Sequence, residues 1–233
     1  NQACKAANEL KMAIVTGHTG TYDGLSTLLA TCTAYGIIRK DELITPAGAK
    51  PGDYLLCTKP IGLETLTNFA LTHRTLAKEL FGPKQALSLA KQVKMQTCVE
   101  EALLLAKIGG VSAMHDATEG GLVAALNEMA EASHVGFSID FVKLPILPEL
   151  QTLARHFNLT QEQIMAMSST GTLLAAISPH SKDRIMEALS RRKLNAKIIG
   201  TFSEGKERLI KYDGKEGPFP KEADDPYAQI LRI

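Results

Sequence analysis

Apolar residues recur three and four positions apart in several stretches of the chain, the spacing that places side chains on one face of an α-helix. The pattern is clearest in residues 122–130, where Leu122, Leu126 and Met129 share a face and Asn127 and Glu128 lie opposite. Similar stretches predict further helices at residues 1–10, 64–80, 84–107, 149–157, 160–165 and 181–192. Each helix is therefore expected to pack one apolar face against a core.

Short apolar runs bounded by glycine, proline or polar residues alternate with these helices and predict strands. They lie at residues 12–16, 54–58, 108–114, 136–140, 173–177, 196–202 and 208–212, and residues 28–38 are expected to be extended. Alternating strands and helices without internal repeats indicate an α/β fold, a mixed sheet with helices packed on it. The glycine- and proline-rich tail from Asp213 is expected to be irregular, and residues 40–53 are the best candidate for a domain boundary.

Composition and charge narrow the classes of function. The chain is 45% hydrophobic and 22% charged with a formal net charge of +1, so we expect a globular protein without the basic surface that attracts nucleic acid or an anionic membrane. No pair of the four cysteines has metal-ligand spacing, which favours a reduced, cytoplasmic protein without a metal site. The chain opens on Asn1 inside a predicted helix, and we expect it to be a fragment of a longer gene product.

The junction between the predicted strand 108–114 and the helix 122–130 carries the strongest candidate chemistry. Gly120 and Gly121 stand where each costs about 1 kcal/mol relative to alanine, which indicates a need for bare backbone. Asp116 and Thr118 are good N-cap residues, and Glu119 follows Asp116 at capping-box spacing. A polar, glycine-rich turn before a helix N-terminus can bind an anion, because free N–H groups and the helix dipole point at the ligand. A tight turn that binds nothing is the alternative.

Other polar residues stand beside predicted strands. The imidazole of His115 and the carboxylate of Asp116 could orient a ligand or transfer protons, or simply form the turn. Gly17, His18 and Thr19 follow the predicted strand 12–16 and fit either a loop near a nucleotide or a plain turn. The hydroxyls of residues 168–170 could bind phosphate, although such residues also commonly form turns before a strand.

Four segments in order carry a resemblance to a known family. Residues 115–122 (HDATEGGL) resemble the signature turn of the aminoimidazole ribonucleotide (AIR) synthetase superfamily. Residues 51–62 (PGDYLLCTKPIG) resemble the start of that family's C-terminal domain, residues 16–19 (TGHT) the end of its N-terminal domain, and residues 169–174 (STGTLL) a late segment. The match covers nearly the whole chain and is most similar to the branch of hydrogenase-maturation, HypE-like proteins.

The resemblance implies a protein of two domains, with residues 1–45 as the tail of the ATP-binding N-terminal domain and residues 46–233 as the C-terminal domain. Members of the family pair as homodimers, bind ATP and Mg²⁺, and activate an oxygen or a similar atom by phosphoryl transfer. The expected partners are therefore a phosphate-bearing small molecule or nucleotide and, in the full-length form, a second copy. We predict that ligand or phosphate binding involves Asp116, Thr118, Gly120, Gly121, His115, Gly17, His18 and Thr19.

Two departures from the HypE-like pattern limit what the resemblance implies. HypE carries its transferable group on a C-terminal cysteine, whereas this chain ends in Ile233 and its last cysteine is Cys98. Gly20 stands where those sequences have glutamate, and Thr16 where they have glycine. The family's metal-binding carboxylates lie mostly in the N-terminal domain, so we expect this fragment alone not to turn over ATP. The alternative is a non-catalytic, nucleotide- or metabolite-binding regulator or metallocentre-assembly partner of the same fold.

Overall fold

The computed structural model describes residues 2–232 and divides the chain into two units, one ending at Ile38 and one beginning at Arg39. The first unit contains helix α1 (Gln2–Glu9), as predicted. Residues 12–38 form no strand, so the strand predicted at residues 12–16 is wrong. Ile14 and Val15 are exposed there, and no neighbouring strand supplies the ladder that an apolar run needs to become part of a sheet. The assignment of residues 1–45 to a preceding domain stays a prediction.

The second unit is built on one mixed sheet of seven strands in the order β2-β4-β1-β5-β3-β6-β7. All neighbouring pairs are antiparallel except β3 and β6, which run parallel. The strands are β1 (Tyr54–Thr58), β2 (Val111–Asp116), β3 (Gly136–Asp140), β4 (Leu173–Ile177), β5 (Ala196–Ser203), β6 (Arg208–Tyr212) and β7 (Lys215–Pro218). The predicted α/β class with a mixed sheet is confirmed.

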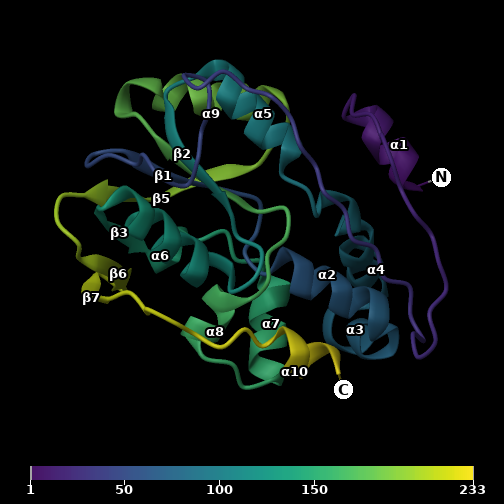
Figure 1. Cartoon of the computed structure of the whole chain (residues 1–233). Coiled ribbons are helices and arrows are strands. Elements are labelled where there is room, and N and C mark those ends of the chain that lie inside the picture. The colour runs from purple at the N-terminus through teal and green to yellow at the C-terminus, as the bar shows by residue number, and fades with distance from the viewer. Residues whose placement is uncertain (1, 233) are drawn as a thin grey trace. The chain divides into compact units, whose positions relative to one another are not determined.

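Helices cover both faces of this sheet (Figure 1). Strand β1 shows why, because its side chains alternate between the two faces: Leu55 and Cys57 pack in the cluster that includes α6 (Gly121–Ser133). Leu56 faces the opposite cluster, which includes α5 (Val99–Ile108) and α9 (Lys182–Arg191). The strand is apolar on both faces because both are buried.

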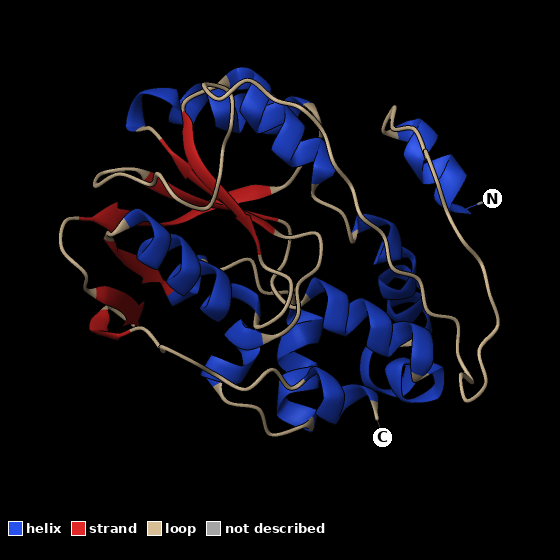
Figure 2. Ribbon diagram, viewed as in Figure 1, coloured by secondary structure: helices blue, strands red, loops and turns tan. Residues whose placement is uncertain are grey.

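A second group of helices lies beside the sheet and forms its own core (Figure 2). Phe69 is fully buried there, with edge-to-face contacts to Phe81 and Phe157, and Ile230 near the C-terminus joins the same cluster. Its helices are α2 (Leu63–Thr72), α3 (Arg74–Phe81), α4 (Pro83–Lys91), α7 (Pro148–His156) and α10 (Tyr227–Leu231). The short helix α8 (Gln161–Ala166) and the 3₁₀ turns η1 (Gln92–Met95), η2 (Phe141–Lys143) and η3 (Pro179–Ser181) complete the unit. Among residues 2–232, no helix combines the length and hydropathy needed to cross a membrane.

Both long helices predicted before β2 are interrupted. The helix expected at residues 64–80 breaks at His73, whose ring packs 5.4 Å from that of Phe69 and whose Nε2 lies 3.3 Å from the carbonyl of Leu231. The helix expected at residues 84–107 stops after α4 and resumes at Val99. A β-carbon on Gly171 would lie 2.2 Å from the carbonyl oxygen of Met95, so the loop before β4 packs directly on this break. Tertiary contacts override the local helical pattern at both places.

The C-terminal part contains a hairpin of β6 and β7, which was not predicted from the sequence. Asp213 and Gly214 have φ of 48° and 79°, the pair of positive values that a two-residue type I′ turn requires. Tyr212 and Lys215 close the turn as partners in the β6–β7 ladder. The expectation of an irregular tail is therefore wrong for β7 and for α10, although residues 219–226 form no regular element.

Candidate functional site

Three loops meet at one edge of the sheet. β1 and β2 both end there, and β4 begins there because it runs antiparallel to both, with Asp116 paired to Leu173 and Cys57 to Leu174. The loop after β1, the turn after β2 and the loop at residues 168–172 therefore converge. These are the segments that carried the motifs at residues 51–62, 115–122 and 169–174, so the fold brings three of the four motif segments together.

Backbone and hydroxyl hydrogen bonds tie the three loops to one another. Ser169 is fully buried; its N–H donates to the carbonyl of Ala117 at 3.1 Å, and its hydroxyl accepts from the N–H of Gly62 at 2.7 Å. Thr172 accepts from the N–H of Ala117 at 2.9 Å through its carbonyl and donates its hydroxyl to the carbonyl of Pro60 at 2.8 Å. The loops are thus held in one arrangement before any ligand arrives.

The turn between β2 and α6 differs from its expected capping. Asp116 is the last residue of β2, the hydroxyl of Thr118 hydrogen-bonds to its carboxylate, and Glu119 is exposed. The N-cap of α6 is Gly120, with φ of 68°, and no side chain caps the helix, so the predicted caps at Asp116 and Thr118 and the capping box are wrong. The reason is that β2 runs two residues further than its predicted end.

Gly121 is needed first for packing. It has φ of 54°, and a β-carbon there would lie 2.4 Å from the carbonyl oxygen of Met167 and 2.7 Å from that of Met165. Gly120, half-buried, is crowded only by the side chain of Ala124 at 2.7 Å. Because the first intrahelical bond runs from the N–H of Ala124 to the carbonyl of Gly120, the preceding N–H groups have no partner within the helix. The residues of this first turn, Gly121, Leu122 and Val123, are buried, and Gly120 before them is half-buried.

His115 is turned away from the turn and toward α6. Its Nδ1 lies 2.7 Å from the carbonyl oxygen of Asp116, and its Nε2 lies 2.6 Å from a carboxylate oxygen of Glu128. Both neighbours are hydrogen-bond acceptors, one on the strand and one on the helix. His115 therefore fastens the end of β2 to α6, and its contact with a ligand stays a prediction.

A buried ion pair, which was not predicted from the sequence, connects the segments around this edge of the sheet. Lys59 follows β1, is 8% exposed and has φ of 56°; its ammonium contacts the carboxylate of Glu101, which is 2% exposed. The ammonium also donates to the carbonyls of Thr97 at 2.7 Å and Gly171 at 3.1 Å. The pair therefore joins the end of β1, the start of α5 and the loop before β4. Spacing alone gives no signal for it, because the two residues are far apart in the chain.

The hydroxyls of Ser168 and Thr170 are engaged by carboxylates, whereas that of Ser169 donates to the carbonyl of Met167 at 2.7 Å. The backbone N–H and hydroxyl of Ser168 donate to Asp225 at 3.1 Å and 2.5 Å. The backbone N–H of Thr170 donates to Glu64 at 3.3 Å, and its hydroxyl contacts the same carboxylate oxygen. These two carboxylates disfavour an anion at the hydroxyls of Ser168 and Thr170.

Two cysteines show the electrostatic character of this edge. Burial raises the pKa of the half-buried Cys98 thiol, and the carboxylate of Asp116 adds to the increase. Burial raises the pKa of the Cys57 thiol inside β1 to about 12. Both cysteines are therefore protonated thiols near neutral pH, the less nucleophilic form.

The remaining predicted site residues lie in the first unit. Gly17, His18 and Thr19 are exposed and belong to no helix or strand. Their proposed closeness to a nucleotide stays a prediction. Within residues 2–232, no three His, Cys, Asp or Glu side chains are grouped as metal ligands.

Comparison with known proteins places this chain in one protein family. The model of "AIR synthase related protein, C-terminal domain" matches residues 50–212. A putative hydrogenase expression/formation protein of Methanocaldococcus jannaschii is 28% identical over 202 residues, which cover 84% of this chain and 56% of the relative. Carbamoyl dehydratase HypE of Cupriavidus necator is 26% identical over 222 residues, covering 91% of this chain and 58% of the relative.

A solved structure supports the same fold. The crystal structure of hydrogenase maturation protein HypE in complex with ATP aligns with a TM-score of 0.61 at 17% identity, covering 82% of this chain and 56% of that one. The chain thus spans about half the length of the proteins that it matches.

Proposed function

Because this chain belongs to the AIR synthase related proteins, we propose that it supplies the C-terminal-domain part of an ATP-dependent enzyme of that family. In this proposal the turn between β2 and α6 is the anion site. The observation that carries the proposal is the convergence of three motif segments at one edge of the sheet, fixed by buried hydrogen bonds. The ligand is a phosphate group, of a nucleotide or of a phosphorylated substrate.

The local chemistry favours an anion at the turn itself. The first turn of α6 presents backbone N–H groups without intrahelical partners and the positive end of the helix dipole. Gly120 offers backbone unshielded by a side chain, whereas the hydroxyl of Thr118 is already engaged by the carboxylate of Asp116. The likeness to HypE, whose structure was solved with ATP, supports a nucleotide as the source of the phosphate.

Magnesium and the second half of the active site belong to the proposal for the full-length protein. Phosphoryl transfer depends on Mg²⁺ to neutralise the charge that develops on the transferred group. We propose that the carboxylates for this ion lie in the part of the relatives that this chain does not match, and that the full-length protein pairs as a homodimer.

The charge of Glu119 gives a direct test of the anion site. Glu119→Lys changes the exposed turn by two charges, and we expect the affinity for ATP and for orthophosphate to rise about fivefold at low salt, because each unit charge a few ångströms from the anion contributes about 1 kcal/mol or less in water. Isothermal titration calorimetry measures the change. Glu204→Lys is the matched control, because it alters the same charge at another exposed position.

Equal gains in the two variants would mean that net charge rather than the turn attracts the ligand. The gain is also expected to shrink as the salt concentration rises from 0.05 to about 0.5 M, because the charge is exposed to screening ions. A gain that is independent of salt would contradict the electrostatic explanation.

Turnover separates the enzyme from the alternative, a non-catalytic regulator or metallocentre-assembly partner that binds the same ligand. We expect the 233-residue chain to bind ATP but to release no phosphate above background in the presence of Mg²⁺, whereas the full-length gene product releases phosphate. The measurement is a coupled phosphate-release assay on both proteins. Release by the isolated chain would refute the incomplete-site proposal, and no release by the full-length protein with any acceptor would favour the regulator.

A further inference from the structure

A hollow of about 590 Å³ opens between η2, α7 and α8. It is lined mainly by Phe141, Ile146, Gln151, Arg155, Gln161 and Ile164. A neighbouring hollow of about 420 Å³ shares four of these residues and extends to Lys197, Tyr212 and Asp213. Binding sites for small organic molecules typically enclose about 300–1,000 Å³, so each hollow is large enough for one.

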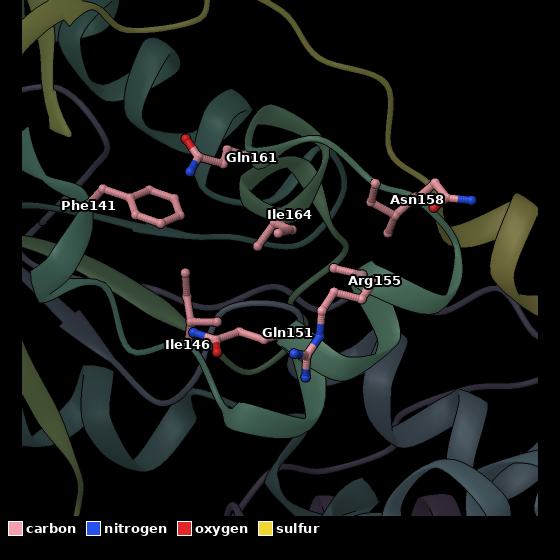
Figure 3. A pocket seen from close by; sticks show the side chains of 9 residues that line it. Phe141, Ile146, Gln151, Arg155, Asn158, Gln161 and Ile164 are labelled. Atoms are coloured by element: carbon pink, nitrogen blue, oxygen red, sulfur yellow. The ribbon is translucent and has the colours of Figure 1, made fainter. Parts of the chain in front are cut away.

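The lining separates apolar and polar groups. Phe141, Ile146 and Ile164 present carbon side chains toward the middle of the hollow, and Gln151, Gln161 and Arg155 lie around them (Figure 3). Phe141 is held in place by the ring of Tyr212, whose centroid lies 5.1 Å away. Such an arrangement fits a flat ligand whose faces are apolar and whose edge is polar.

The polar groups specify the edge of that ligand. Gln151 and Gln161 are exposed, and each amide both donates and accepts, as recognition of ring nitrogens and exocyclic groups requires. The guanidinium of Arg155 donates to the hydroxyl of Thr152 at 3.3 Å, a neutral acceptor, and it forms no ion pair within residues 2–232. Arg155 is therefore available for an anionic group, and a guanidinium binds phosphate well.

Other ligand classes fit less well. The larger hollow has no carboxylate in its lining, so it lacks the oxygen ligands that a Mg²⁺ or Ca²⁺ ion prefers. Free phosphate would leave the apolar lining uncovered, and a lipid chain would leave two amides and a guanidinium beside hydrocarbon.

We propose that this hollow is a second binding site, for a nucleoside monophosphate, with the base between Phe141, Ile146 and Ile164 and the phosphate at Arg155. The site differs from the turn after β2, because no residue of that turn, 116–121, lines the hollow. The proposal does not rest on the function proposed above.

The test is calorimetric titration of the full chain with AMP, UMP, adenosine, ribose 5-phosphate and orthophosphate. We expect AMP or UMP to bind at least tenfold more tightly than ribose 5-phosphate and orthophosphate. Arg155→Gln is expected to weaken binding of that nucleotide about tenfold, the loss of one charge-assisted contact, while the affinity for adenosine changes less than twofold. Arg191→Gln is the matched control, because Arg191 is an exposed arginine on α9 that lines neither hollow.

A second variant, together with a comparison with the turn after β2, makes the outcome decisive. Gln151→Trp, at an exposed position of α7, fills the hollow and is expected to abolish nucleotide binding there while the far-ultraviolet circular dichroism is unchanged. Binding of AMP and UMP no tighter than that of ribose 5-phosphate overturns the proposal. Nucleotide binding that responds to Glu119→Lys but not to Gln151→Trp also overturns the proposal, because the ligand then binds at the turn after β2. If the hollow instead prefers a peptide or a sugar, the nucleotide fails to bind, which overturns the proposal as well.

Discussion

Replacing Lys59 with methionine is expected to lower the free energy of unfolding by about 3–5 kcal/mol, the range observed when one partner of a buried ion pair is removed. The variant would leave the carboxylate of Glu101, 2% exposed, without its cation. The carbonyls of Thr97 and Gly171 would lose their donor as well. Because these groups join β1, α5 and the loop before β4, we expect the loss to be among the largest for any single substitution outside the apolar core.

Urea unfolding followed by circular dichroism measures this loss. The double variant Lys59→Met/Glu101→Leu removes both charges and is expected to recover most of the stability, since apolar replacement of a whole buried pair is often neutral or stabilising. Lys143→Met is the matched control: Lys143 is an exposed lysine 3.7 Å from Asp140, and its loss is expected to cost less than about 1 kcal/mol. A loss at Lys59 no larger than at Lys143 would show that the buried pair contributes little.

Gly121→Ala is expected to give the second large effect, for a steric reason. Its φ of 54° costs an alanine about 1–2 kcal/mol, and the overlap of the new β-carbon with the carbonyls of Met165 and Met167 adds about 1–3 kcal/mol. The neighbours in this case are backbone atoms, which cannot rotate away as a side chain can. We therefore expect the start of α6 and the end of α8 to separate.

Gly205→Ala isolates the conformational part of this cost. Gly205 has φ of 81°, but a β-carbon there would meet no atom within 4 Å. Denaturant unfolding of both variants is the measurement, and Gly121→Ala should be the less stable by about 1–3 kcal/mol. Equal losses would mean that only the backbone angle, not close packing, requires glycine at position 121. The same packing makes Gly121 a poor position for testing ligand binding, which is why Glu119 is the better choice.

Much of the fold followed from local patterns. The strands predicted at residues 54–58, 136–140, 173–177 and 208–212 are found with those bounds, because short apolar runs between turn residues leave few alternatives to a buried strand. The errors lie where distant contacts compete with local preference. His73 breaks one predicted helix, and the loop at Gly171 packs on the break in another. The hairpin turn at Asp213 and Gly214 was a local signal that the glycine- and proline-rich composition of the tail obscured.

For the candidate site, the position of the turn was predictable from the sequence, but the roles of its residues were not. The glycine pair, the motif order and the resemblance to the AIR synthetase superfamily identified the turn from sequence, and the family match confirmed that resemblance. The roles of individual residues did not follow, because side-chain partners depend on which elements meet. Gly121 proved to be required by packing on Met165 and Met167, and His115 engages Glu128.

The sequence by itself determined the family, the fold class and the position of the glycine turn, because each depends on residue types at short spacing along the chain. Only the tertiary structure decided that three separate loops share one edge of the sheet, and that Lys59 and Glu101 fasten them from within. The physical reason is that an antiparallel strand returns distant residues to the same edge, where burial forces charged and polar groups to find partners that no local pattern specifies.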